Sequence, residues 1–128
     1  MTRARILVAD DHELIRDKVV RLLQREFDVL EAVADGQALL DAAARMKPDV
    51  CVLDISMPVM NGIETANRLK QSGSGAKVIF LTVHDDSDFV GAAFQNGAEG
   101  YVIKCRMASD LIAAVREVLA GRTFVSAT

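Results

Sequence analysis

The chain has 128 residues, of which 51% are hydrophobic and 26% charged, and its formal net charge is −3. This length suits one domain of roughly 100–200 residues, large enough to fold around its own core without a disulfide or a metal. The composition argues against disorder, and no apolar run reaches the ~18 residues of a membrane span. The acidic balance argues against a nucleic-acid surface, which needs a basic patch. By itself the chain is expected to bind neither DNA nor a membrane.

The N-terminus and the cysteines indicate a cytoplasmic protein. Two arginines precede the first apolar run, but the run stops at Asp10 without a small-residue cleavage site, so it is not a signal peptide. Cys51 lies inside an apolar run and is expected to be a small buried hydrophobic residue. Cys105 follows Lys104, and a reducing compartment disfavours a disulfide between the two cysteines.

Short aliphatic runs alternate with longer amphipathic ones along the chain. Five short runs predict strands, at 5–9, 29–34, 49–54, 77–82 and 101–104. The aliphatic run at 5–9 is typical of a strand buried on both faces, whereas the run at 29–34 is weaker because Glu31 lies inside it. Five amphipathic stretches predict helices between and after them, at 14–23, 37–46, 63–70, 89–94 and 111–119. Gly97 and Gly121 are typical helix-ending residues. Strict β-α alternation implies an α/β fold with a doubly wound, five-stranded parallel sheet and right-handed crossovers.

Polar residues collect at the carboxyl ends of these predicted strands. Their positions are Asp10 and Asp11 after the first strand, Asp54 at the third, Thr82 at the fourth and Lys104 at the fifth. In an open parallel sheet, ligands bind where these ends converge. Singly, each residue has an ordinary structural interpretation as a helix cap, turn, strand or surface residue. Together they predict a site for a hard cation and an anion, which fits magnesium phosphate chemistry best.

The charges of this predicted site suggest a reaction. Clustered carboxylates repel one another, so one of them takes a raised pKa or the cluster binds a metal. Lys104 opposite Asp54 would supply roughly 4 kcal/mol of Coulomb energy at ~4 Å and an effective dielectric of ~20, before desolvation. An aspartate can attack phosphorus to form an acyl phosphate if a metal and an ammonium neutralise the approaching anion.

These motifs resemble the receiver domain of two-component response regulators. The resemblance is carried by Asp10-Asp11, the segment DISMPVMNG at 54–62, Thr82 and GYVIK at 100–104. It implies a flavodoxin-like three-layer sandwich and a single receiver domain over residues 1–128, with its core at about 4–122. The tail AGRTFVS at 120–126 resembles the NarL/FixJ subgroup, whose receivers continue into a helix-turn-helix domain.

The resemblance implies a role for each residue of the site. Asp54 would be the phosphoacceptor and, with Asp11 and the Ser56 backbone carbonyl, would bind Mg²⁺, for which Mn²⁺ can substitute. Asp10 would act on the metal through water. Thr82 and Lys104 would contact the phosphoryl group. Thr82 and Tyr101 would form the switch that repacks the face formed by the fourth helix, the fifth strand and the fifth helix.

Three positions near the site depart from, or add to, this pattern. Cys105 stands where many receivers have a proline, which leaves the geometry of that loop open. His84 lies two residues past Thr82, where the family tunes water access, and is predicted to position water. His12 is interpreted as a helix-start residue rather than a ligand.

The resemblance also implies partners and leaves alternatives. A cognate sensor histidine kinase would supply the phosphoryl group, a homodimer is a further expectation, and DNA would be bound through a C-terminal domain outside this chain. The chain would catalyse only its own phosphorylation and slow dephosphorylation and is not otherwise an enzyme. The alternatives are a stand-alone receiver acting on protein partners, a haloacid-dehalogenase-type phosphohydrolase and a flavodoxin-like cofactor module. Against the last two, Asp10 and Asp11 are adjacent rather than spaced Asp-x-Asp, and acidic residues replace a phosphate-cradling loop.

Overall fold

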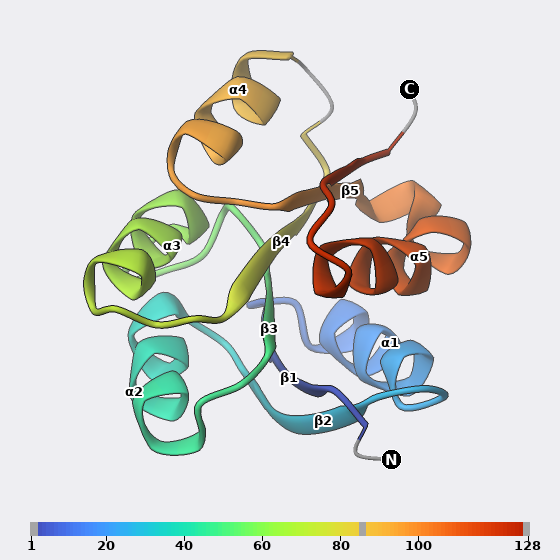
Figure 1. The fold of residues 1–128 in the computed structure, drawn as a ribbon, viewed down its shortest axis with the longest axis horizontal. Helices are drawn as coiled ribbons and strands as arrows, with labels where there is room; N and C mark the ends of the chain where they lie inside the picture. Colours follow the sequence, from blue (N-terminus) through green and yellow to red (C-terminus); the bar gives the residue numbers. More distant parts are fainter. Residues whose placement is uncertain (1–2, 85–86, 127–128) are drawn as a thin grey trace.

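The computed structural model describes residues 3–84 and 87–126, and strands alternate with helices along them (Figure 1). The strands are β1 (Arg5–Ala9), β2 (Asp28–Val33), β3 (Val50–Leu53), β4 (Lys77–Thr82), β5 (Gly100–Ile103) and β6 (Phe124–Val125). The helices are α1 (Glu13–Leu23), α2 (Gly36–Met46), α3 (Gly62–Gln71), α4 (Ser87–Gln95) and α5 (Met107–Leu119), with a 3₁₀ turn η1 (Lys104–Arg106) before α5. The predicted elements are confirmed, although α5 begins four residues before the predicted 111–119, because the sequence prediction started at the aliphatic stripe and left out Met107, Ala108, Ser109 and Asp110.

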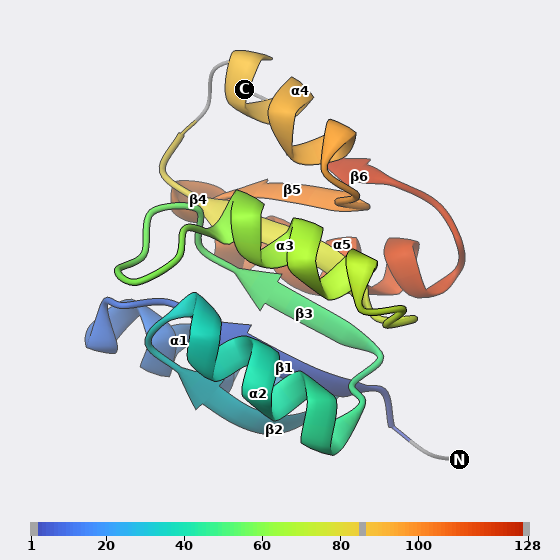
Figure 2. The same ribbon diagram turned by 90° about the vertical axis from the view of Figure 1, so that its left-hand side faces the viewer.

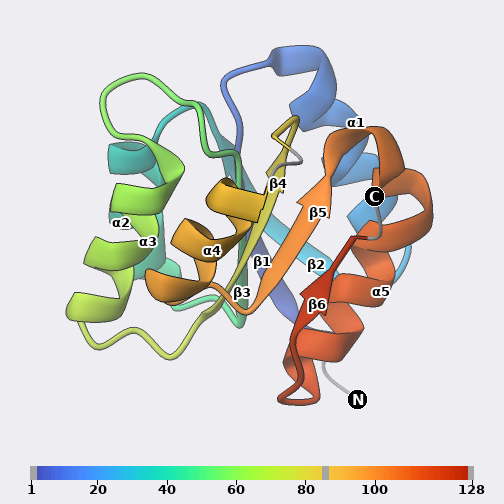
Figure 3. The ribbon, with the colours of Figure 1, turned by 90° about the horizontal axis from the view of Figure 1, so that it is seen from above.

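The strands form one parallel sheet in the order β2-β1-β3-β4-β5-β6. Helices α2, α3 and α4 cover one face and α1 and α5 cover the other (Figures 1 and 3). The chain starts at β1, the second strand of the sheet, runs outward to the edge strand β2 and returns to β3 on the other side of β1. This reversal brings the carboxyl ends of β1 and β3 together, which is where open α/β sheets bind ligands. The doubly wound fold is confirmed, but the count of five strands was one too low.

Two cores lie on the two faces of the sheet. Side chains alternate along a strand, so Leu7 packs in the α2–α3–α4 core while Ile6 and Val8 pack in the α1–α5 core. All three are at most 1% exposed. Because both faces are covered, the central strands have no polar face, which explains the continuous aliphatic runs in the sequence. Figure 2 shows α2 and α3 lying across one of these faces.

Side-chain caps fix where two of the helices begin. The Asp35 carboxylate accepts a hydrogen bond from Ala38 N at 2.8 Å at the start of α2. The Asn61 side chain accepts one from Glu64 N at 2.8 Å at the start of α3. Each cap satisfies a backbone N–H that has no partner within its helix. The Asn61 cap also ends the loop that begins at Asp54.

The sixth strand and Ser126 cover the β5 edge of the sheet (Figure 3). Val125 pairs with Tyr101, and Ser126 N donates to Tyr101 O at 2.9 Å. The Ser126 hydroxyl accepts from Ile103 N at 3.2 Å and donates to Asp110 Oδ2 at 2.8 Å. Burial acts to raise the pKa of Asp110, but hydrogen bonds, first among them the one from Ser126, outweigh it and lower that pKa. β6 was not predicted, because a strand of two residues is too short to show a periodic pattern.

In the described part of the chain, none of the helices combines the length and the hydrophobicity needed to cross a membrane.

Candidate functional site

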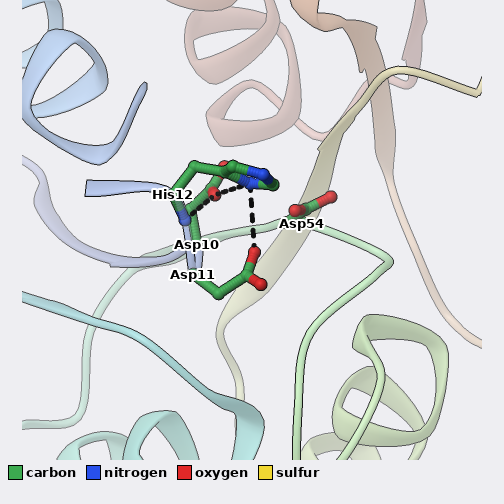
Figure 4. A group of neighbouring side chains, drawn as sticks. All are labelled: Asp10, Asp11, His12 and Asp54. Carbon is green, nitrogen blue, oxygen red and sulfur yellow. Dashed lines mark hydrogen bonds and ion pairs between the residues drawn. The ribbon is translucent and has the colours of Figure 1, made fainter. Parts of the chain in front are cut away.

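Three aspartates and a histidine meet at the carboxyl ends of β1 and β3 (Figure 4). Asp10 directly follows β1 and Asp54 directly follows β3, and the last residues of these strands are paired. Asp54 N donates to Ala9 O at 2.9 Å, which extends the β1–β3 ladder to the site. Ligand atoms of Asp10, Asp11, His12 and Asp54 all lie within 4.8 Å of one another. The pairing of strand ends thus converts residues far apart in sequence into one cluster.

Lys104 bridges the two buried carboxylates of this cluster. Its Nζ lies 2.9 Å from Asp10 Oδ2 and 3.2 Å from Asp54 Oδ2. Asp10 is 2% exposed and Asp54 4%, so these ion pairs form largely away from water. The ammonium enters from η1, directly after β5, where the end of that strand directs it across the sheet edge. One cation between two buried anions leaves the cluster with excess negative charge.

This arrangement shifts the pKa values of Asp54 and Lys104. Burial is the main cause that raises the pKa of Asp54, repulsion from Asp10 adds to it, and Lys104 opposes both. For Lys104, burial acts to lower the pKa, but Asp10 and Asp54 together outweigh it and raise that pKa. The ammonium is therefore held charged, while the Asp54 carboxylate is destabilised in its charged form. Such a carboxylate gains from any further cation placed beside it.

The cluster fits a divalent cation on two grounds. Three carboxylates and one ammonium leave two negative charges, which a divalent ion balances. Asp10 Oδ2 is buried and accepts no well-aligned hydrogen bond from the described residues, although it pairs with the Lys104 charge. A carboxylate oxygen held this way can accept a metal-bound water or a metal ion. Mg²⁺ binds such oxygens through one or two carboxylates and keeps several waters.

The side chain of His12 lies within the carboxylate cluster. It is the N-cap of α1, as predicted, but its side chain makes no capping hydrogen bond. Instead Nδ1 lies 3.2 Å from Asp11 Oδ1 and 3.5 Å from Asp10 Oδ1 (Figure 4). Its position next to Asp10-Asp11 was the available signal, but the direction of a side chain after a strand end cannot be inferred from spacing. The ring therefore belongs to the cluster.

A second group of residues connects the site to α4. The His84 ring contacts Ser56 Oγ through Nε2 at 3.2 Å and stacks on Phe89 with ring centroids 4.1 Å apart. His84 N donates to Thr82 Oγ1 at 3.3 Å, and the Tyr101 hydroxyl donates to His84 O at 2.6 Å. Thr82 and Tyr101 are fully buried. His84 thus touches every residue predicted to take part in switching, through contacts that spacing alone does not reveal.

The loop after Asp54 is tightly constrained. Gly62 N donates to Ile55 O at 2.7 Å, and a Cβ at Gly62 would lie 2.1 Å from the Asp54 carbonyl oxygen. Val59 has φ +71°, an unfavourable conformation for a β-branched residue. Its side chain is 80% exposed, so packing does not compensate for this. The loop that carries Ser56 therefore closes back on the Asp54 backbone at Gly62.

The two cysteines differ in environment and are both free. Cys51 is fully buried in β3, which confirms its prediction as a small hydrophobic residue. Burial raises the pKa of its thiol to about 12, against a smaller opposing effect of Lys70. Cys105 is exposed in η1 beside Lys104.

The fold and this site agree with the comparisons to known proteins. Residues 6–116 match the response regulator receiver domain, so the chain belongs to that family. Receivers of this kind are not conventional enzymes. Among curated relatives, the transcriptional regulatory protein DegU of Brevibacillus brevis is 36% identical over 125 residues, covering 96% of this chain and 53% of its own. The oxygen regulatory protein NreC of Staphylococcus haemolyticus is 33% identical, covering 94% of this chain and 57% of its own.

Solved structures show the same relationship. A LuxR-family two-component response regulator from Aurantimonas sp. SI85-9A1 superposes with a TM-score of 0.91 at 33% identity, over 96% of this chain and 89% of that one. The receiver domain of the NarL regulator from Mycobacterium tuberculosis gives 0.91 at 32% identity, over 95% of this chain and all of that one. The chain spans slightly more than half the length of the curated relatives that it matches.

Proposed function

We propose that this chain is a phosphorylation switch in which Asp54 accepts a phosphoryl group from a histidine kinase. The observation that carries the proposal is the pair of buried carboxylates, Asp10 and Asp54, bridged by Lys104 beside the exposed Asp11. This arrangement places an aspartate nucleophile between a fixed cation and oxygens suited to a divalent ion. Asp10, Asp11, Asp54 and the Ser56 carbonyl would hold Mg²⁺ or Mn²⁺.

In the proposed reaction, an Asp54 carboxylate oxygen attacks the phosphorus of a phosphohistidine. The P–O bond to Asp54 forms as the P–N bond breaks, and the electron pair returns to the imidazole of the kinase. Lys104 stabilises the charge on the transferring group, since its ammonium already lies 3.2 Å from Asp54 Oδ2. The divalent ion supplies further neutralisation of that charge. Because Asp54 is only 4% exposed, little bulk water would surround its carboxylate to screen the charge of Lys104.

The same site is proposed to drive a conformational switch. A phosphoryl group on Asp54 offers the Thr82 hydroxyl a charged acceptor for its proton, and movement of the hydroxyl toward that acceptor would lengthen the 3.3 Å hydrogen bond that Thr82 Oγ1 accepts from His84 N. A shift of that loop changes the bond between the Tyr101 hydroxyl and His84 O, and with it the α4–β5–α5 face. Phosphorylation acts by favouring one of two states through these differential contacts.

The proposed setting follows from the relatives. The chain would act in the cytoplasm, and a cognate sensor histidine kinase would be the phosphoryl donor. Because the relatives DegU and NreC are regulatory proteins about twice the length of the match, we propose that this receiver controls transcription through a DNA-binding domain outside the described chain. A receiver that acts on protein partners alone is the second candidate, and self-association would accompany either.

Trapping the product tests the proposal. Incubation with acetyl phosphate and Mg²⁺ is expected to add one phosphoryl group to the chain, and borohydride reduction of the acyl phosphate is expected to convert Asp54 to homoserine. Peptide mass mapping locates the change, and chelation of the metal with EDTA is the control. Homoserine in place of an aspartate other than Asp54 would contradict the proposal. So would phosphoryl labelling that is not diminished by EDTA. Steady turnover of an aryl phosphate would favour a phosphohydrolase instead.

His84 is proposed to position the water that hydrolyses the phosphoryl group. Its ring contacts Ser56 Oγ, two residues after Asp54, and stacks on Phe89. His84→Ala is therefore expected to slow loss of the phosphoryl group several-fold, measured as decay of the labelled mass after removal of acetyl phosphate. His84→Gln, which keeps a hydrogen-bonding side chain, is expected to decay at an intermediate rate. An unchanged rate in the alanine variant would refute this role.

A further inference from the structure

We propose that His12 Nδ1 is a direct ligand of the divalent ion and gives this receiver a nitrogen-containing metal site that favours late first-row transition metals. This inference rests on the proposed function, because it concerns the ion held by Asp10, Asp11 and Asp54. It adds a residue and a metal preference that the oxygen ligands alone do not supply.

The first support is that the His12 side chain is not needed for the helix that it starts. As the N-cap of α1, His12 makes no side-chain capping hydrogen bond. Its backbone N–H donates instead to Asp10 Oδ1 at 2.9 Å, which anchors the residue to the cluster through the main chain. The imidazole is left to point at the carboxylates, as Figure 4 shows.

The second support is distance. In an octahedral site with bonds of about 2.1 Å, neighbouring ligand atoms are about 3 Å apart. His12 Nδ1 lies 3.2 Å from Asp11 Oδ1 and 3.5 Å from Asp10 Oδ1. These separations are close to the spacing of neighbouring ligand atoms around one ion. A carboxylate oxygen of Asp54 lies within 4.8 Å of the ligand atoms of the other three residues.

The chemistry of the donor set then predicts selectivity. Mg²⁺ prefers oxygen ligands and gains little from an imidazole, whereas Co²⁺, Ni²⁺ and Zn²⁺ bind imidazole well. The carboxylates of Asp10 and Asp54, which Lys104 bridges, offer the same oxygen ligands to every divalent ion. His12 would therefore raise affinity for the transition metals while leaving Mg²⁺ affinity nearly constant.

A contrary interpretation makes His12 a positive counter-charge to Asp10 and Asp11. The two interpretations predict opposite results when the ring is removed. Loss of a ligand weakens Co²⁺ binding selectively, whereas loss of a competing positive charge strengthens the binding of every divalent ion. A calorimetric titration of the untagged chain with Mg²⁺ and with Co²⁺ separates them.

The test compares the wild type with His12→Gln and His12→Asn, both of which keep a polar residue at the helix start. Co²⁺ affinity is expected to fall about tenfold or more, while Mg²⁺ affinity changes by less than about twofold. Equal losses for both ions, or a gain for both, would overturn the inference. If neither ion binds the wild-type chain, the metal site of the proposed function fails as well, so the two failures are distinguishable.

A spectroscopic readout on the wild type does not depend on the variants. Mn²⁺ bound to the chain is expected to show nitrogen couplings in pulsed electron paramagnetic resonance, and ¹⁵N-histidine labelling is expected to change them. His12→Gln should remove this signal, whereas His84→Gln should retain it, since the His84 ring contacts Ser56 Oγ and Phe89 instead. Absence of nitrogen coupling in the wild type, or its loss only in the His84 variant, would refute direct ligation.

Discussion

Asp54→Asn is expected to abolish phosphoryl transfer from acetyl phosphate while raising the free energy of unfolding at neutral pH. The amide cannot act as the nucleophile, so the labelled mass should fall below detection. The stability gain follows because burial is the main cause that raises the pKa of Asp54, with Asp10 adding repulsion. A neutral amide of the same shape removes that cost, and Lys104 keeps its ion pair with Asp10 at 2.9 Å.

The sign of the pH dependence follows from the same shift. Because the folded chain holds the Asp54 proton more tightly than the unfolded chain, the wild type loses stability as pH rises above the unfolded value of 3.8. The asparagine variant lacks this loss. Urea titrations should therefore show a stability difference that is small at acid pH and grows toward neutrality. Asp17→Asn, on the exposed surface of α1, is the matched control and should change neither property. A variant less stable than the wild type at neutral pH would contradict this account.

Gly62→Ala is expected to destabilise the chain by about 3 kcal/mol or more and to disable the site without touching a charged residue. A Cβ at this position would lie 2.1 Å from the Asp54 carbonyl oxygen and 2.9 Å from Ile55 Cα. Both atoms are backbone, so relief requires the Asp54 loop to move. Denaturant unfolding measures the stability, and labelling by acetyl phosphate measures the site.

Gly91→Ala is the matched control for this substitution. Gly91 lies in α4, and nothing lies within 4 Å of a Cβ built there. Alanine in a helix is more favourable than glycine by roughly 0.5–1 kcal/mol, so this variant should be slightly more stable than the wild type. If Gly62→Ala proved as stable as Gly91→Ala, the described closeness of the loop to Asp54 would be wrong.

Most of the fold could be predicted from the sequence because the central strands are buried on both faces. Runs such as 5–9 and 77–82 are continuous in hydrophobicity, and Gly97 and Gly121 mark helix ends with φ of +96° and +84°. The sixth strand could not be predicted in this way. Its two residues pair with β5 because the loop after α5 returns there, which is a tertiary effect that local patterns do not encode.

The site shows the same division. Asp10, Asp54 and Lys104 could be predicted to meet because the carboxyl ends of neighbouring parallel strands share one edge. The direction of the His12 ring and the bond from Tyr101 to the His84 carbonyl could not. Both depend on loop conformation after a strand end, where side-chain direction is no longer set by a period of two.

The cover over β5 has a consequence for how copies of this unit could meet. An exposed strand edge is a template for pairing with another chain, and native sheets protect their edges with charges or short covering segments. Here β6 and the Ser126 hydroxyl occupy the backbone groups along β5. The opposite edge strand, β2, carries Asp28 and Glu31, whose charges oppose strand addition. The two edge strands of the sheet, β2 and the two-residue β6, are thus poor templates for a further strand.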